Sequence, residues 1–314
     1  MQKKRYLGIF LGGSYGLIFR ILGGLKITQD FYSIYSITFI WLVPILISLT
    51  PILFARKEIM NSVLRQFSYP FLSVIAFFAL ALATRLEDLF CILILGLPFF
   101  IAAGITGIII GQFVKRLSNN NILSLLLLPL LLNPLENLLP SSQETFEIKS
   151  KTVINTSRES VWEKIIEVPE IKENEYYPGF YNLMGVPRPI RSKLEEINGI
   201  NYRIGYFTDG LKLVESISEI DTLNQVTFQI HLDKSQLRDI PMDKHVLQGN
   251  YFRFKNITYQ LKALSQNKTE LTLTCSYKIN SKMNFYANFW ASDVVEDFET
   301  KLLQALKLKI EKQY

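Results

Sequence analysis

The stretch that decides the fold is Asn284–Lys312, NFYANFWASDVVEDFETKLLQALKLKIEK, close to the C-terminal end of the chain. Its apolar residues recur at helical spacing, and no glycine or proline lies between them: Tyr286, Trp290, Val294, Phe298, Leu302, Ala305 and Leu306. Asn284 is a suitable N-cap residue. The pattern predicts one long amphipathic helix whose solvent side holds Glu296, Glu299, Lys301, Gln304 and Lys307.

The segment before this helix alternates strictly between apolar and polar residues. In Thr269–Ile279 one side holds Leu271, Leu273, Cys275, Tyr277 and Ile279. Because successive side chains of a strand point to opposite faces, this alternation predicts a half-buried strand. A half-buried strand followed by a helix with a wide apolar face predicts a curved antiparallel sheet that grips the helix.

Composition divides the 314 residues into two regions. Residues 1–140 consist mostly of apolar runs, whereas residues 141–314 are mixed and highly charged. The first region holds 11 Lys and Arg against 5 Asp and Glu, and the second holds 23 against 23. The net charge of +6 therefore belongs to the apolar region, and the neutral second region argues against nucleic-acid binding. We expect an all-α transmembrane bundle at 1–140 and an α+β domain at 141–314.

Five apolar runs in the first region are candidates for membrane spans of about 20 residues. They are Tyr6–Leu25, Phe31–Phe54, Phe67–Thr84, Leu89–Val114 and Ile122–Leu139. The basic start MQKKR also occurs in signal peptides, but Arg20 inside the first run and the runs that follow favour a retained span. The fifth run is short and ends in polar residues, so an interfacial helix is the alternative there.

Lys and Arg predict how these spans are oriented. With the N-terminus in the cytoplasm, the cytoplasmic flanks hold eight basic residues between Lys3 and Arg116, whereas the opposite loops hold only Lys26 and Arg85. Because cytoplasmic loops are enriched in Lys and Arg, we expect a cytoplasmic N-terminus in a bacterial inner membrane or a plasma membrane. With five crossings, we expect residues 141–314 to lie outside the cytoplasm, whereas four crossings would return them to it.

Arg20 is a charged residue within an apolar run, where a charge is costly unless it is paired or reaches the membrane surface. It marks either a polar cavity in the bundle or a side chain that snorkels to the nearer surface. The runs contain no series of carboxylates or histidines of the kind that relays protons, so transport is not expected.

Strand signals dominate the second region. A strand at Phe146–Ile154 precedes a short helix at Arg158–Val168 and an irregular stretch to Pro189. Four further strand segments are separated by turn residues and form a meander: Lys193–Ile197, Asn201–Phe207, Leu211–Ile220 and Gln225–Leu232. His245–Leu264 predicts a long strand or hairpin, and its apolar phase slips near Lys255 and Asn256 as at a bulge.

This order of elements resembles the helix-grip domain of the START-like (SRPBCC) superfamily, particularly its polyketide cyclase/dehydrase-like branch. The resemblance covers Phe146–Gln313 and rests on VINTSRESVWEKI at 153–165, YRIGYFTDGLKLVESI at 202–217 and NFYANFWASDVVEDF at 284–298. It implies that an apolar or amphipathic ligand binds between the sheet and the last helix, where a minority of members catalyse cyclisation or dehydration. It supplies no catalytic motif and does not extend to the apolar region.

Six residues are candidates for lining such a cavity: Tyr206, His245, Tyr251, Tyr277, Trp290 and Asp293. The tyrosines combine an apolar body with a polar tip, and ordinary sheet core is the alternative for them. His245 is the candidate acid–base residue, with a structural histidine as the alternative. Asp293 is either a buried acid with a raised pKa or an exposed charge favoured by the helix dipole. His231 alternates out of phase with its apolar neighbours, so we expect it to face solvent.

No nucleophile with an adjacent base, phosphate loop or metal-ligand cluster stands out, so no cofactor or metal is expected. Cys91 and Cys275 lie in different regions, which makes a disulfide between them improbable. We predict a membrane-anchored domain that binds a hydrophobic small molecule or lipid. The alternatives are a membrane-bound cyclase, dehydratase or hydrolase, which requires two ionisable side chains facing one cavity, and a receptor or scaffold, which requires a filled interior and an exposed apolar patch.

Overall fold

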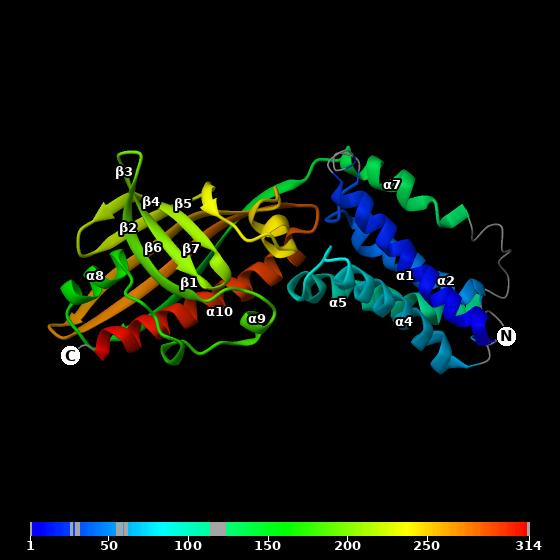
Figure 1. Ribbon diagram of the computed structural model, residues 1–314, viewed down its shortest axis with the longest axis horizontal. Coiled ribbons are helices and arrows are strands. Elements are labelled where there is room, and N and C mark those ends of the chain that lie inside the picture. The colour runs from blue at the N-terminus through cyan, green and yellow to red at the C-terminus, as the bar shows by residue number, and fades with distance from the viewer. Residues whose placement is uncertain are drawn as a thin grey trace. The chain divides into compact units, whose positions relative to one another are not determined.

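The computed structural model describes residues 2–25, 28, 32–54, 59, 62–113 and 124–312. The chain forms two compact units, Met1–Ser141 and Ser142–Tyr314. Figure 1 shows that the first unit consists of helices, and that the second combines a sheet with a long helix. Each unit is therefore built around its own core, and each is described by itself.

The N-terminal unit contains six helical elements among its described residues: α1 (Gln2–Gly24), the π-helix η1 (Thr38–Leu42), α2 (Val43–Phe54), α4 (Val63–Ala83), α5 (Leu89–Phe113) and α7 (Leu128–Asn137). Three helices there are long and apolar enough to span a membrane, namely Tyr6–Gly24, Val63–Ala83 and Leu89–Ile109, and Thr38–Phe54 is a shorter apolar helix. The prediction of five spans is thus supported for three runs. The ten residues of α7 rise only about 15 Å, half of the hydrocarbon core, and Ile122 and Leu123 lie outside the described residues.

Arg20 does not snorkel to a surface. Its side chain is 3% exposed and forms an ion pair with Glu87, whose side chain is 1% exposed. Arg20 also donates a hydrogen bond to the carbonyl of Leu86, at 2.8 Å. A buried guanidinium needs a carboxylate and backbone acceptors to offset its lost hydration, and the turn after α4 supplies both.

Removing one partner of this pair should destabilise the helical unit. Glu87→Ala leaves the Arg20 charge buried without its carboxylate, so we expect a loss of about 3–5 kcal/mol in unfolding free energy. Denaturant titration of the full chain in detergent micelles, followed by far-ultraviolet circular dichroism, measures the loss. The double variant Arg20→Met/Glu87→Met should recover most of it, because an apolar pair leaves no uncompensated charge. Equal losses in both variants would contradict a role for the charge.

The C-terminal unit is an α+β domain. It begins with β1 (Ser142–Ile154), α8 (Arg158–Ile166), the 3-10 turn η3 (Glu173–Glu175) and α9 (Phe180–Leu183). A meander follows: β2 (Pro189–Ile197), β3 (Ile200–Phe207), η4 (Thr208–Gly210), β4 (Lys212–Asp221) and β5 (Gln225–Gln236). The chain closes with the π-helix η5 (Asp243–Leu247), β6 (Phe252–Ser265), β7 (Lys268–Ser281) and α10 (Asn284–Glu311).

The seven strands form one antiparallel sheet in the order β1-β7-β6-β5-β4-β3-β2. The sheet curves around α10, drawn red in Figure 1, which runs along its inner face. This arrangement confirms the predicted helix-grip architecture. The bulge predicted near Asn256 is also present, because the pairing of β6 with β7 shifts register between Phe254 and Asn256.

Two clusters of buried side chains join α10 to the sheet. Leu302, Leu303 and Leu306 pack with Leu271 and Leu273 of β7 in the larger cluster. Val295 packs with side chains of β7 in the second cluster, one of them Tyr277. Burying this much apolar surface, at about 25 cal/mol per Å², is what fixes the helix in the concave sheet.

Two local predictions differ from the structure. Asn284 is the first residue of α10 rather than its N-cap, and its side chain accepts a hydrogen bond from the Ser281 N–H and donates to the Ser142 carbonyl. His245 lies in η5 and not in a strand, because β6 begins only at Phe252. Both positions belong to connections, where side-chain bonds to neighbouring loops override the local pattern.

Candidate functional site

Glu299 lies on the inner face of α10, one turn from Val295 and one turn from Leu302. It is 2% exposed. The sequence prediction that placed Glu299 on the solvent side of the helix is therefore wrong. Tyr181 of α9 donates a hydrogen bond to Asp293, so α10 makes contacts outside its sheet-facing side as well. The sheet-facing side contains Glu299.

The Glu299 carboxylate has no hydrogen-bond partner among the described residues, although both oxygens are buried. Burial raises the pKa of Glu299 to about 7, and the nearby Ser150 hydroxyl and Cys275 backbone lower it only in part. Neither of these neighbours makes a hydrogen bond of good geometry to the carboxylate. A carboxyl group with this pKa gains and loses its proton near neutral pH.

A second buried acid, Glu215 on β4, is fully compensated. It pairs with Arg203 on β3, and both side chains are 6% exposed. The Arg203 Nε donates to the Ile166 carbonyl at 3.0 Å, and the guanidinium carbon lies 4.6 Å from the centre of the Phe228 ring. Strand register places Arg203 opposite Glu215, so the pair is built into the β3–β4 hairpin. The Arg203–Glu215 pair therefore carries no net charge.

Three further polar side chains share this interior: Tyr259 on β6, and Cys275 and Tyr277 on β7. Burial raises the pKa of Tyr259 to about 12 and raises the pKa of the Cys275 thiol far above its ordinary value. Tyr277 donates a hydrogen bond to Asn288 of α10 at 2.9 Å. All three are therefore neutral at physiological pH, and Cys275 lacks the thiolate character that a nucleophile needs.

A pocket of about 280 Å³ opens between the edge strand β1 and α10. Its lining is mostly polar and includes Ser150, Thr152, Glu296, Thr300 and Leu303. Ser150 lies close enough to influence the pKa of Glu299, and Glu296 and Leu303 flank Glu299 on the same helix. The pocket therefore approaches the buried carboxylate from the open edge of the sheet.

The structure brings only Tyr277 of the six predicted site residues into this interior cluster. Tyr206 belongs to a separate cluster with Tyr202 and Ile204, and its hydroxyl donates to Glu195. Tyr206 alternates with Phe207, whose ring lies 6.1 Å from that of Phe298 on α10, so Tyr206 faces the other side of the sheet.

The remaining predicted residues lie around the domain. His245 is half-buried in η5, and the backbone carbonyl of Tyr251 accepts from the Asn280 N–H at 2.9 Å. Trp290 is half-buried and meets Phe289 edge-on, and Asp293 is exposed and accepts a hydrogen bond from Tyr181. The exposed position of Asp293 excludes a buried acid, and its place in the third turn of α10 also excludes the first-turn charge of the helix-dipole alternative.

His231 was predicted to face solvent, and the structure places it differently. It is half-buried, its Nε2 lies 2.7 Å from the Ser216 hydroxyl, and its ring meets Tyr202 edge-on at 5.9 Å. Sequence reasoning also missed Glu299, Arg203 and Glu215. The signal for the pair was that Arg203 and Glu215 each lie six residues from Asp209. The signal for Glu299 was its spacing from Val295 and Leu302.

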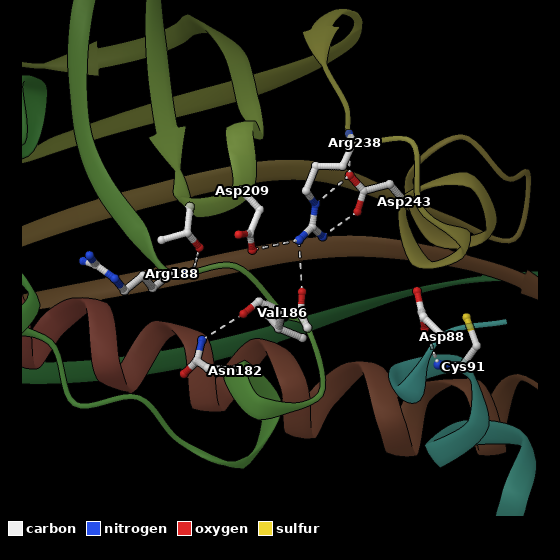
Figure 2. A network of polar contacts seen from close by, with 10 residues as sticks. Asp88, Cys91, Asn182, Val186, Arg188, Asp209, Arg238 and Asp243 are labelled. Atoms are coloured by element: carbon white, nitrogen blue, oxygen red, sulfur yellow. Dashed lines mark hydrogen bonds and ion pairs between the residues drawn. The ribbon is translucent and has the colours of Figure 1, made fainter. Parts of the chain in front are cut away.

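A polar network around Arg238 fixes three loops of the same domain (Figure 2). Arg238 pairs with Asp243, whose side chain is fully buried, and reaches Asp209 of η4 at 3.7 Å. Its Nη1 also donates to the Gly185 carbonyl, at 3.1 Å. Figure 2 shows Asp209 and Asp243 pointing toward the guanidinium of Arg238. The loops after α9, β3 and β5 are thus held by a planar group with several fixed donors.

The fold and the site define a helix-grip domain attached to an apolar helical region. No protein-family model and no curated protein matches the chain. Solved structures match it over the C-terminal half.

Three of these structures illustrate the similarity. The Zhui aromatase/cyclase from Streptomyces sp. R1128 is 12% identical with a TM-score of 0.36, and the match covers 54% of this chain and 96% of the other. Norcoclaurine synthase from Thalictrum flavum is 10% identical, with a TM-score of 0.34 and coverage of 55% and 98%. An uncharacterized protein from Bacillus thuringiensis is 15% identical, with a TM-score of 0.33 and coverage of 52% and 98%. At these values the likeness bears on neither a ligand nor a reaction.

Neutralising Glu299 should stabilise the domain, and the gain should depend on pH. The folded-state pKa of about 7 lies above the ordinary 4.5, so ionisation of Glu299 lowers stability as pH rises through this window. We expect Glu299→Gln to raise the unfolding free energy by about 1–3 kcal/mol at pH 8 and by much less at pH 4.5. Urea unfolding of the full chain at both pH values measures this. Exposed Glu296→Gln is the matched control, and a pH-independent gain would contradict the assignment.

Proposed function

We propose that the C-terminal domain binds a hydrophobic or amphipathic small molecule between its sheet and α10, and that the N-terminal helices anchor it to a membrane. The observation that supports ligand binding most directly is the buried Glu299 carboxylate without a partner. Buried charged groups are nearly always paired, so an exception indicates a functional site. A ligand that donates a hydrogen bond to Glu299 would supply the missing partner.

The surroundings of Glu299 suit the apolar part of such a ligand. Large buried side chains of β6, β7 and α10, with Tyr259, Leu273 and Leu302 among them, pack there as an apolar core, part of which the ligand would displace. Binding sites for small molecules are typically apolar with a few polar groups at fixed positions. Here the fixed polar group is held on a helix by packing on both sides, which keeps its position well defined.

The pocket beside β1 is the proposed route to this site. Among the described strands β1 lies at the edge of the sheet beside β7, and none of them closes the space between its free edge and α10. Ser150 both lines the pocket and lies close enough to Glu299 to affect its pKa. A modest outward displacement of α10 or β1 would join the two.

An enzyme that uses the same interior is the second candidate, as a cyclase, dehydratase or hydrolase. The observation in its favour is the pKa of Glu299, which at about 7 suits a general acid or base. Binding alone requires that ligand be recovered unchanged, whereas catalysis requires that Glu299→Gln abolish turnover without abolishing binding.

Membrane anchoring rests on the three apolar helices and on apolar residues at one end of the domain. Phe285 and Phe289, on the first turns of α10, are 76% and 59% exposed. The side chain of Asn284 is tied to Ser142, the first residue after the helical region. We propose that a bilayer covers these phenylalanines, because the chain leaves the apolar region at this point and aromatic side chains are favoured at membrane interfaces.

The side of the membrane depends on the number of crossings. The expected extracytoplasmic location required that the fifth run cross, and α7 is too short to do so by itself. Three long helices and the shorter Thr38–Phe54 give an even number of crossings if each spans once. We therefore propose that both ends of the chain lie on the cytoplasmic side.

A reporter fused after Tyr314 tests this orientation. With four crossings, a reporter that is active only in the cytoplasm should be active, and alkaline phosphatase, which requires export, should be silent. Fusions after Lys26 serve as the matched control and should show the opposite pattern. Activity of the exported reporter at Tyr314 would restore the five-span arrangement.

Blocking the route beside β1 should weaken ligand binding. Ser150→Phe fills the space between β1 and α10, so we expect at least about a 10-fold loss of affinity, equivalent to about 1.4 kcal/mol, for the uncharged fluorophore N-phenyl-1-naphthylamine. Fluorescence of the full chain in lipid nanodiscs, above that of empty nanodiscs, measures binding. Glu147→Phe on the exposed side of the same strand is the control. Equal affinity of both variants, at unchanged melting temperature, would remove the proposed route.

A further inference from the structure

We infer that the polar group of the ligand is a hydrogen-bond donor, an ammonium or a hydroxyl, which binds the carboxylate of Glu299. This inference rests on the proposed ligand site and specifies the class of molecule that fits it. The ligand would be an apolar amine or alcohol, and molecules whose polar group is a carboxylate or a phosphate would be rejected.

The charges of the interior support this choice. Arg203 is the buried cation of the described interior, and Glu215 and the Ile166 carbonyl already occupy its guanidinium. An anionic ligand would have to displace Glu215 to gain that partner, leaving Glu215 buried and unpaired. The free-energy penalty of leaving Glu215 buried and unpaired exceeds the gain from an ion pair between the ligand and Arg203.

Glu299 offers the opposite chemistry. An ionised carboxylate has two acceptor oxygens and no donor, so it can bind only a group that brings N–H or O–H. No described side chain makes that bond to Glu299 in the structure. A charge-assisted hydrogen bond to a carboxylate is about twice as strong as a neutral one, which is enough to select the ligand.

The other titratable groups around Glu299 do not reverse this preference. From the sheet, Cys275, Tyr259 and Tyr277 face it as neutral groups. Glu296, one turn away on α10, adds a second negative charge. Lys149 and Lys151 lie at the pocket, but they alternate with Ser150 along β1 and are exposed. Their charges therefore face water, which screens them from the interior.

Three probes with the same apolar body test the inference on the full chain in lipid nanodiscs. They are 2-(1-naphthyl)ethylamine, 2-(1-naphthyl)ethanol and 1-naphthylacetate, with 1-methylnaphthalene as the probe that lacks a polar group. We expect the amine and the alcohol to bind at least about 10-fold more tightly than the carboxylate, after binding to empty nanodiscs is subtracted. Glu299→Gln should reduce amine binding at least about 10-fold, whereas Glu147→Gln, on the exposed side of β1, should leave the order of affinities unchanged.

The outcomes separate the inference from the proposed function. Saturable binding of methylnaphthalene together with equal or tighter binding of the carboxylate would overturn the donor preference and leave the ligand site standing. Binding of none of the four probes would overturn the ligand site itself. The comparison among probes uses the natural chain, so it remains decisive even if Glu299→Gln fails to fold, and circular dichroism of that variant reports whether it does.

Discussion

The interior of the C-terminal domain depends on how ionisable side chains are accommodated away from water. Arg203 and Glu215 meet this requirement together, because strand pairing sets them opposite each other and Phe228 covers the guanidinium. Arg20 and Glu87 form a similar buried ion pair in the helical unit. Glu299 is the exception, since its oxygens are buried without partners. Because the buried carboxylate loses its hydration, its pKa is raised. The pocket beside β1 lies close to this carboxylate.

Much of the fold could be predicted from the sequence because its signals are local and repeated. Alternation in Thr269–Ile279 and turn residues such as Asp209-Gly210 identified strands that the structure contains. The bulge near Asn256 followed from a slip in the same alternation. The number of spans was harder to predict, because leucine content does not reveal how long a helix is. In the fifth run only the ten residues of α7 form a continuous helix among the described residues.

The candidate site was mostly missed because it depends on which side of α10 meets the sheet. Val294 and Val295 are adjacent, so the apolar pattern is compatible with two rotations of the helix that differ by about 100°. One rotation exposes Glu299, and the other buries it. Contacts far apart in sequence decide between them, including that of Tyr181 with Asp293 and that of Lys309 with Glu175. The inward position of Tyr277 on β7 could be predicted because strand alternation leaves no such freedom.

Whether the site binds a ligand or also catalyses a reaction depends on the side chains around Glu299. A general acid or base needs a second group that stabilises the charge developing on the substrate. Arg203 is engaged by Glu215, and the Cys275 thiol keeps its proton because burial raises its pKa. Burial brings the pKa of Glu299 to about 7, so its charge state changes near neutral pH. A lone carboxyl group of this kind can hold a donor and exchange a proton with it, which favours reversible ligand binding over bond-breaking chemistry.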